Sequence, residues 1–400
     1  MNSETTLSSA RCEGIRIGII AGEDSGDQLG AALIPALRQH FPAAIFEGVG
    51  GERMIAEGFR SLYPQERLAV MGLVEPLKRL PELLRIRAGL ERHFVAHHFA
   101  LVLGIDSPDF NLGLELHVRQ RGLLTAHYVS PSVWAWRQGR IRKIARAVDH
   151  MLTLLPFESE FYQQHGVPVT FVGHPLADSM PLDPDPVAAR QRLGLPADGQ
   201  LLALMPGSRS GEIALMAPLF LDVARWLLAR QPALRFVMPS ANDARHGQLQ
   251  ALLQNHGDLP VTLVRGQSHA VMEAANAVLL TSGTTALEAM LLKKPMVVSY
   301  RMGAASYWLL SRLVKTPWVS LPNLIAGEAL VPELIQDEAT VERLGEETLC
   351  QLQDDALRAR LASIFTDMHR TLRRNASQVA ADTLAALIRQ RRGEACDAVR

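Results

Sequence analysis

The sequence predicts an α/β protein made of two doubly wound domains in tandem. Short apolar runs alternate with amphipathic stretches along the 400 residues, which is the pattern of βαβ units in a parallel sheet. The length exceeds what one hydrophobic core usually organises, so about two domains are expected. A proline-rich stretch at 173–199 interrupts the rhythm, which then restarts. Domains of this kind bind ligands on the loops that follow their strands.

The apolar runs give the expected strands of each half. In the first half they lie at 16–20, 45–49, 101–105, 125–129, 151–155 and 170–172. In the second half they lie at 201–205, 235–239, 261–264, 278–280 and 296–299. We therefore expect a first domain at 1–178 and a second at 179–355. Apolar residues at helical spacing predict closing helices over 356–392, and we expect the tail 393–400 to fray.

Composition and charge exclude several classes of protein. The 41 basic residues balance the 41 acidic ones, so nothing attracts the whole chain to nucleic acid. Cys12, Cys350 and Cys396 lie far apart and form neither a disulfide framework nor a zinc motif, which fits a reducing cytoplasm. The uncharged run 123–136 is too short to span a bilayer, and the N-terminus lacks the apolar segment of an export signal.

The loop after the first strand, "AGEDSGD", is acidic. It lacks the G-x-G-x-x-G spacing of a dinucleotide fingerprint, and its carboxylates would repel a pyrophosphate. We expect it to suit the hydroxyl groups of a sugar acceptor, with Asp27 available to cap the helix that follows. The alternative is an ordinary strand-to-helix turn.

Asp106 directly follows a buried strand in "LVLGIDSPDFN". An unpaired charge costs several kcal/mol, roughly, to bury, so this carboxylate should face a solvated cleft, where it is a candidate general base. The alternative is that Asp106 or Asp109 caps the helix that begins near Phe110, and for Asp109 we favour this interpretation.

Two loops of the second half suit anions. In "MPGSR", Gly207 and Ser208 open a helix with Arg209 in its first turn, and the free N–H groups, the helix dipole and the guanidinium favour phosphate, although the P-loop spacing is missing. In "TSGTTALE", residues Ser282, Gly283 and Thr284 lead into a helix that would favour a diphosphate. Glu288, one turn inside, could accept hydrogen bonds from ribose hydroxyls. The alternative for this second loop is a capping box formed by Thr285 and Glu288.

Together the motifs resemble the lipid-A-disaccharide synthase family over nearly the whole chain. "AGEDSGD", "GIDSPDFN", "HYVSPSVWAWR", "LPFE", "MPGSR", "SGTTALE" and "LVKTPWVSLPN" occur in the family's order. The resemblance implies the glycosyltransferase-B fold, with two facing Rossmann-like domains, and an inverting transfer. The donor would be UDP-2,3-diacylglucosamine, the acceptor 2,3-diacylglucosamine 1-phosphate, and the product a β-1,6-linked disaccharide. No cofactor is implied. The oligomeric state stays open, with a homodimer as one alternative.

The resemblance also implies roles for single residues. Asp106 matches the base that acts on the acceptor hydroxyl, and Glu23 and Ser25 match acceptor-side positions. Arg209, Glu288 and Asn323 match donor-side positions. Glu23 and His127 remain alternatives to Asp106 as the group that finally holds the proton. We expect no metal, and we interpret Asp183 and Asp185 as part of a solvated linker.

Two segments could meet the membrane that holds the acylated substrates. The stretch 74–92 places Leu77, Leu80 and Leu84 on one helical face, with Leu83 and Ile86 beside them and an excess of basic residues such as Arg85. A core-facing helix would look the same, but the implied substrates favour peripheral contact with the cytoplasmic face of the inner membrane. The stretch 129–146, with two tryptophans and five basic residues, is either a core pair before a solvated helix or a site near phosphate or anionic lipid.

Three rival interpretations remain. The first is another enzyme of the same fold that uses UDP-N-acetylglucosamine, either an epimerase or a transferase. The second is a non-catalytic protein that binds sugar nucleotides or lipids, which would not need Asp106. A nicotinamide enzyme is disfavoured because the glycine fingerprint is absent.

Overall fold

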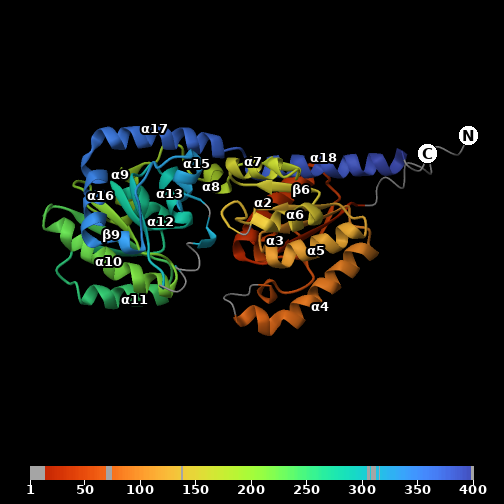
Figure 1. Ribbon diagram of the computed structural model, residues 1–400, viewed down its shortest axis with the longest axis horizontal. Helices are drawn as coiled ribbons and strands as arrows, with labels where there is room; N and C mark the ends of the chain where they lie inside the picture. The colour runs from red at the N-terminus through yellow and green to blue at the C-terminus, as the bar shows by residue number, and fades with distance from the viewer. Residues whose placement is uncertain are drawn as a thin grey trace, which may run out of the picture. The chain divides into compact units, whose positions relative to one another are not determined.

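A computed structural model of the chain describes residues 14–68, 74–136, 138–303, 307, 312–314 and 316–397, with only the backbone for 74–78 and 394–397. The chain forms two compact units (Figure 1). Unit 1 consists of the described residues of Met1–Pro175 and Leu372–Arg400, and unit 2 consists of those of Leu176–Thr371.

Unit 1 is built on a seven-stranded parallel sheet with the order β3-β2-β1-β4-β5-β6-β7. The strands are β1 (Arg16–Ala21), β2 (Ile45–Val49), β3 (Arg60–Ser61), β4 (Leu101–Ile105), β5 (Thr125–Tyr128), β6 (His150–Thr153) and β7 (Val169–Phe171). The helices are α2 (Asp24–His40), α3 (Glu52–Ala56), α4 (Val74–Ala96), α5 (Pro108–Gln120), α6 (Ile141–Ala147), α7 (Pro156–Gln164) and α18 (Ala376–Asp397), with short 3₁₀ turns at Gln65–Arg67 and Gln138–Arg140.

Helices cover both faces of this sheet. Ile19 and Leu103 pack with residues of α2 and α18, such as Leu384, on one face. Ile20 and Val102 pack with residues of α4 and α5 on the other. Successive strand residues point to opposite faces, so a strand buried on both sides favours apolar residues throughout, as in β4 with its sequence LVLGI.

Unit 2 is built on a six-stranded parallel sheet with the order β10-β9-β8-β11-β12-β13. The strands are β8 (Leu201–Met205), β9 (Arg235–Ser240), β10 (Val261–Arg265), β11 (Ala277–Thr281), β12 (Met296–Tyr300) and β13 (Glu333–Ile335). The helices are α8 (Pro175–Ser179), which begins at the unit boundary, α9 (Pro186–Leu193), α10 (Ser210–Leu228), α11 (Asp243–Gln254), α12 (Ser268–Ala274), α13 (Thr284–Leu291), α15 (Leu321–Ala326), α16 (Val341–Gln353) and α17 (Asp355–Leu372), with a 3₁₀ turn at Gln336–Glu338. Asp185 caps α9, accepting a hydrogen bond from Ala188 N at 3.0 Å.

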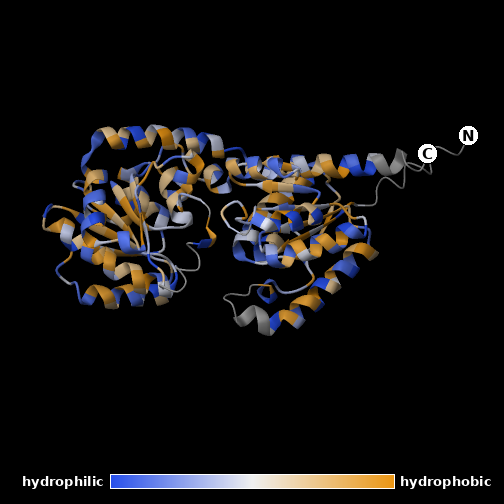
Figure 2. Cartoon of the chain, viewed as in Figure 1, coloured by the Kyte–Doolittle hydropathy of each residue, from blue (hydrophilic) through white to orange (hydrophobic). Residues whose placement is uncertain are grey.

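The fold class predicted from the sequence is confirmed. Every predicted strand is present, with ends shifted by up to two residues, and the strands of both sheets are mostly hydrophobic (Figure 2). Two strands were missed, β3 and β13. They contain two and three residues, too few for a periodic pattern. The closing helices are α17 and α18, and α18 runs on to Asp397, beyond the predicted end at 392. Among the residues that the structure describes, no helix is long and apolar enough to cross a membrane.

Candidate active site

Each sheet has one point at which the strand order reverses. In unit 1 it lies between β1 and β4, and in unit 2 between β8 and β11. Open parallel sheets bind their ligands at such points, beyond the carboxyl ends of the strands, because the two flanking loops diverge there and leave a crevice. The loops that follow these four strands carry residues 22–25, 106–109, 206–209 and 282–285, which are the loops that the sequence singled out.

Asp106 lies in a strained turn directly after β4. Its backbone has φ 52° and that of Ser107 has φ 42°, so two consecutive non-glycine residues are left-handed. Such a conformation costs about 1 kcal/mol or more per residue and persists only where the surroundings enforce it. Asp106 is half-buried, and its N–H donates to Tyr128 O at 2.9 Å. Strain of this kind is typical of functional turns, which favours the interpretation of Asp106 as a functional residue.

The capping role predicted for Asp109 is wrong. Helix α5 begins at Pro108, and its N-cap residue is Ser107, with no side-chain cap hydrogen bond. The Asp109 side chain is 87% exposed and pairs with Arg140. Arg140 therefore lies beside the first turn of α5, and that turn follows Asp106 and Ser107 directly in the sequence. Arg137, the other basic residue considered for this place, lies outside the described residues.

The acidic loop after β1 presses against the Asp106 turn. A Cβ atom at Gly22 would come within 2.9 Å of Ser107 Oγ, so a larger residue there would require the Ser107 side chain to move. Glu23 and Ser25 are exposed at the start of α2. Contrary to the prediction, Asp27 does not cap α2. Its side chain is buried and caps α3 instead. Its carboxylate accepts hydrogen bonds from the N–H groups of Gly51, Arg53 and Met54 at 2.8, 3.1 and 3.1 Å.

His127 is not available as a base. Its side chain is completely buried, and Nδ1 lies 2.8 Å from Glu115 Oε1 in the interior of unit 1. An acceptor hydroxyl could not reach it without opening the core. Of the three alternatives for the proton acceptor, Asp106 and Glu23 remain.

The loops of unit 2 enclose a cavity of about 510 Å³ at its switch point. The structure brings together here the predicted donor residues Ser208, Arg209, Ser282, Gly283, Thr284 and Glu288. The end of β9 and the connection from β10 to α12 complete the lining with Ser240, Gln267 and Ser268, which sequence reasoning missed. These residues follow predicted strands 235–239 and 261–264, so the rule that ligands bind at strand ends could have found them.

The N-terminus of α10 is not free, contrary to the prediction. The carboxylate of Glu212 accepts hydrogen bonds from Ser208 N and Arg209 N, both at 3.2 Å, and from Arg209 Nη1 at 3.2 Å. Gly207, with φ 105°, makes room for this carboxylate, because a Cβ atom there would come within 2.7 Å of Glu212 Oε2. An internal anion thus occupies the donors expected to bind phosphate.

The N-terminus of α13 has no such internal anion among the described residues. Its N-cap residue, Gly283, has φ 154° and no side-chain cap hydrogen bond. The helix begins at Thr284, so Thr285 is already its second residue and the capping box proposed for Thr285 and Glu288 is absent. Glu288 Oε1 instead lies 3.3 Å from His269 Nε2, and this hydrogen bond raises the pKa of His269. Helix α13 is therefore the better anion site of the two.

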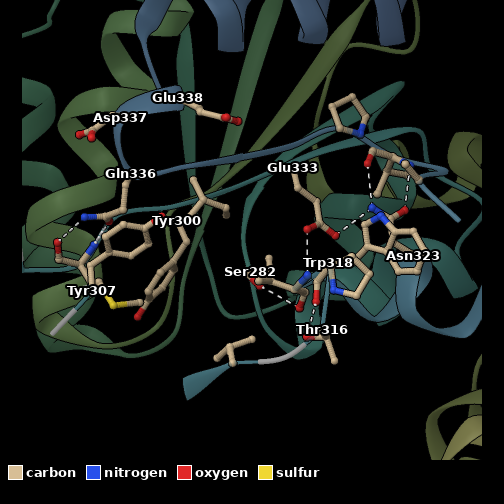
Figure 3. A pocket seen from close by; sticks show the side chains of 18 of the residues that line it. Ser282, Tyr300, Tyr307, Thr316, Trp318, Asn323, Glu333, Gln336, Asp337 and Glu338 are labelled. Atoms are coloured by element: carbon tan, nitrogen blue, oxygen red, sulfur yellow. Dashed lines mark hydrogen bonds between the residues drawn. The ribbon is translucent and has the colours of Figure 1, made fainter. Parts of the chain in front are cut away.

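Asn323 is buried and holds the surrounding loop together through hydrogen bonds, so its side chain is not free to contact the sugar donor. Its Oδ1 accepts hydrogen bonds from Leu330 N and Val331 N at 2.8 and 2.9 Å, and Nδ2 donates to Val331 O and Glu333 Oε1 at 2.9 and 2.8 Å (Figure 3). An amide has two donor hydrogens and two acceptor lone pairs, so all its capacity is used. The donor-side role implied for Asn323 would thus be indirect, through the loop that it holds.

Glu333 extends this tie towards the nucleotide cavity. Its carboxylate accepts hydrogen bonds from Val319 N at 2.8 Å and from Ser320 N at 2.9 Å. Val319 O in turn faces Ser282 Oγ at 3.5 Å. A second cavity of about 960 Å³ lies beside these groups (Figure 3). Its lining shares Arg209, Glu212 and Ser282 with that of the first cavity.

Helix α4 has both a core face and an exposed apolar face. Ile86 and Leu90 are buried in unit 1. The prediction that Ile86 lies beside the exposed leucines is therefore wrong. Leu80 and Leu84 are 46% and 48% exposed, and Arg85 beside them is exposed. The side chain of Leu77 lies outside the described residues.

The aromatic loop after β5 is fixed by a buried carboxylate. Trp134 is half-buried, packs edge-on against Phe157 with ring centres 4.7 Å apart, and donates from Nε1 to Glu158 Oε1 at 3.2 Å. Glu158 Oε2 accepts a hydrogen bond from Leu155 N at 3.1 Å. Burial raises the pKa of Glu158 to about 7.

The two units and their switch points define the class of protein. The structure resembles UDP-GlcNAc 2-epimerase from Neisseria meningitidis, with a TM-score of 0.58 at 12% identity over 92% of this chain and 99% of that one. It also resembles a UGT transferase from Siraitia grosvenorii, with a TM-score of 0.59 at 12% identity over 92% and 99%. The fold is that of the glycosyltransferase-B proteins and the related epimerases.

Sequence similarity then identifies the family. The family model described as lipid-A-disaccharide synthetase matches residues 17–387. Lipid-A-disaccharide synthase of Hahella chejuensis is 54% identical over 385 residues, 96% of this chain and 97% of the relative. That of Cellvibrio japonicus is 56% identical over 375 residues, 94% and 98%. The chain belongs to the lipid-A-disaccharide synthase family and is a glycosyltransferase of lipid A biosynthesis.

Proposed function

We propose that the chain condenses UDP-2,3-diacylglucosamine with 2,3-diacylglucosamine 1-phosphate, forming the β-1,6-linked lipid A disaccharide 1-phosphate and releasing UDP. The observation that carries this proposal is the half-buried Asp106 in a strained turn at the switch point of unit 1. An epimerase shares the fold, but its likeness to this chain, at 12% identity, extends to the fold alone.

Asp106 is proposed to act as the general base. The oxygen of the acceptor 6-hydroxyl attacks the anomeric carbon, its proton passes to the Asp106 carboxylate, and the bond to UDP breaks with its electron pair leaving on the diphosphate. A carboxylate is a weak base, so it accepts the proton late, as the new bond forms. Glu23 and Ser25, exposed at the start of α2, are proposed to bind acceptor hydroxyls.

The donor is proposed to bind in the cavity of about 510 Å³ in unit 2. The diphosphate would lie at the N-terminus of α13, against Ser282, Gly283 and Thr284, where N–H groups and the helix dipole stabilise the charge of departing UDP. Arg209, with an exposed side chain, could add a charge-assisted contact once it leaves Glu212. Glu288 is proposed to accept hydrogen bonds from ribose hydroxyls.

Peripheral contact with the cytoplasmic face of the inner membrane is proposed for the exposed face of α4. Both substrates carry acyl chains that hold them in a bilayer, so the enzyme has to reach them at the bilayer surface. Leu80 and Leu84 expose apolar side chains beside the basic Arg85, a pattern that suits the interface of an anionic bilayer.

Asp106→Asn tests the proposed base. We expect kcat for disaccharide formation to fall by roughly 100-fold or more, the typical contribution of general acid–base catalysis, with the dissociation constant of UDP unchanged. Asp109→Asn is the matched control, because Asp109 is an exposed carboxylate three residues further on, in the first turn of α5, and it should keep most of the activity. Wild-type kcat in Asp106→Asn would exclude Asp106 as the base. A wild-type chain that binds UDP-diacylglucosamine but forms no disaccharide would support the non-catalytic alternative.

A further inference from the structure

Three polar side chains that the proposed mechanism does not use are buried between α5 and the sheet of unit 1. Asn111, Glu115 and His127 are all completely buried. Asn111 and Glu115 are four residues apart, so they lie on the same face of α5. His127 lies on β5, which pairs with β4. These groups sit directly behind the turn that carries Asp106.

Asn111 ties the turn to the sheet. Its Nδ2 lies 2.8 Å from Asp106 O, 3.2 Å from Ile20 O and 3.3 Å from Ile105 O. The two hydrogens of the amide are thus shared among Ile20 near the end of β1, the last residue of β4 and the first residue of the strained turn. The contact with Asp106 O is the shortest of the three. A side chain at position 111 therefore controls the backbone from which the Asp106 carboxylate projects.

Glu115 and His127 hold α5 against the sheet. The two side chains meet at 2.8 Å with both completely buried. The sheet leaves space for them, because a Cβ atom at Gly104 would lie 2.2 Å from Glu115 Oε1 and 2.7 Å from Asn111 Cβ. Buried ionisable pairs add little net stability, since apolar residues of similar volume often stabilise a core as well or better. Their presence here favours a role in fixing one arrangement of the helix.

We propose that Asn111 is a positioning residue for Asp106, and that Glu115 and His127 keep α5 in the register from which Asn111 reaches the turn. The left-handed backbone at Asp106 and Ser107 is unfavourable by itself, so it needs an enforcing contact. Without the bond from Asn111 to Asp106 O, the turn relaxes and the carboxylate moves from its productive place. This inference rests on the proposed function, in which Asp106 is the base.

A double-mutant cycle tests this inference. We expect Asn111→Ala to lower kcat by roughly 10- to 100-fold, because small displacements of a reacting group cost this much, and to leave the dissociation constant of UDP unchanged. If Asn111 acts through Asp106, adding Asn111→Ala to Asp106→Asn should lower kcat no further. Asn255→Ala is the matched control, because Asn255 is an exposed asparagine at the end of α11 in unit 2, and it should keep wild-type kcat.

The outcomes separate the two proposals. Equal losses from Asn111→Ala in the wild-type and Asp106→Asn backgrounds, or wild-type kcat in Asn111→Ala, would overturn the positioning role. Wild-type kcat in Asp106→Asn alone would instead overturn the proposed base. Circular dichroism and UDP binding establish that each variant is folded. If Asn111→Ala is not, the cycle is run with Glu115→Gln, which keeps the volume and an acceptor for His127. Wild-type kcat there, or a loss that persists in Asp106→Asn, would then overturn the inference.

Discussion

The switch-point turns of the two units occupy the same place in the same kind of sheet and differ in chemistry. After β4 in unit 1 the chain carries Asp106 and Ser107, two left-handed residues that are not glycine. After β11 in unit 2 it carries Gly283 at positive φ, flanked by Ser282 and Thr284. Unit 1 accepts backbone strain in order to present a carboxylate, whereas unit 2 avoids strain and leaves helix N–H groups open. The fold thus provides two equivalent switch points, and we expect the turn residues to decide which kind of ligand binds at each.

Placing a carboxylate in the switch-point turn of unit 2, as unit 1 has in its own turn, should change UDP binding more than any other substitution considered for this comparison. Thr284→Asp places a carboxylate in the first turn of α13, where the diphosphate is proposed to bind. We expect the dissociation constant of UDP, measured by calorimetry, to rise roughly 100-fold through charge repulsion, while thermal stability rises slightly because an acidic residue suits a helix N-terminus. Thr284→Asn is the uncharged control, with a change below about tenfold. Unchanged UDP affinity in Thr284→Asp would place the diphosphate elsewhere.

The carboxylate behind the aromatic loop of unit 1 should make stability depend on pH. Burial raises the pKa of Glu158 to about 7, above its ordinary value of 4.5, so the folded state favours the protonated form. The stability that this group contributes is complete below pH 4.5 and is lost as the pH rises through 7. Glu158→Gln should therefore gain stability relative to wild type by about 2 kcal/mol between pH 5 and pH 8, measured by urea unfolding. A difference independent of pH would show that Glu158 ionises freely.

The exposed leucines of the two units offer a third contrast. Replacing Leu80 and Leu84 together by serine should weaken binding to vesicles of anionic phospholipid by roughly tenfold, because buried apolar area drives interfacial binding. The matched control is Leu215→Ser in unit 2, since Leu215 on α10 is 48% exposed, as Leu84 is, and this variant should bind like wild type. Equal vesicle binding by all three proteins would exclude the exposed face of α4 as the docking surface.

Removing the strain of unit 1 should give the smallest effect on stability, with an opposite effect on activity. Asp106→Gly supplies the residue that unit 2 uses at its own turn, and glycine adopts a left-handed conformation without steric cost. We expect unfolding to cost about 1 kcal/mol more, with the melting temperature higher by roughly 2–4 °C, while disaccharide formation is lost. Asp109→Gly, within the first turn of α5, should instead lower the melting temperature. A lower melting temperature in Asp106→Gly would mean that the turn is not strained.

Local patterns in the sequence predicted the sheets and the loops of the site. They did not predict the hydrogen-bond partners of several site residues, because some of these partners lie far away in the sequence. Strand 101–105 and the loop after it follow from an apolar run that ends in a charge. Asp27 caps a helix whose first turn lies about 25 residues further along the chain, and no local pattern marks such a contact. Glu212 covers the N-terminus of α10, but its partner at i−3 is Arg209 rather than the Ser or Thr that signals a capping box. Asn323 could be matched by resemblance, but only its four internal hydrogen bonds reveal how it acts.

The last helix of the chain belongs to its first unit. Ala380, Leu384 and Ile388 of α18 fill the core over β1 and α2, so unit 1 is discontinuous in sequence. A ribosome that has made residues 14–175 has therefore not yet made all of that core, and one apolar face must wait until unit 2 has been synthesised. A fragment that stops after residue 178 should be poorly soluble, whereas one in which residues 372–397 are joined to 14–175 by a linker should fold alone. A fragment that contains unit 1 alone therefore cannot be made by cutting the chain once between the two sheets, because it also needs residues 372–397.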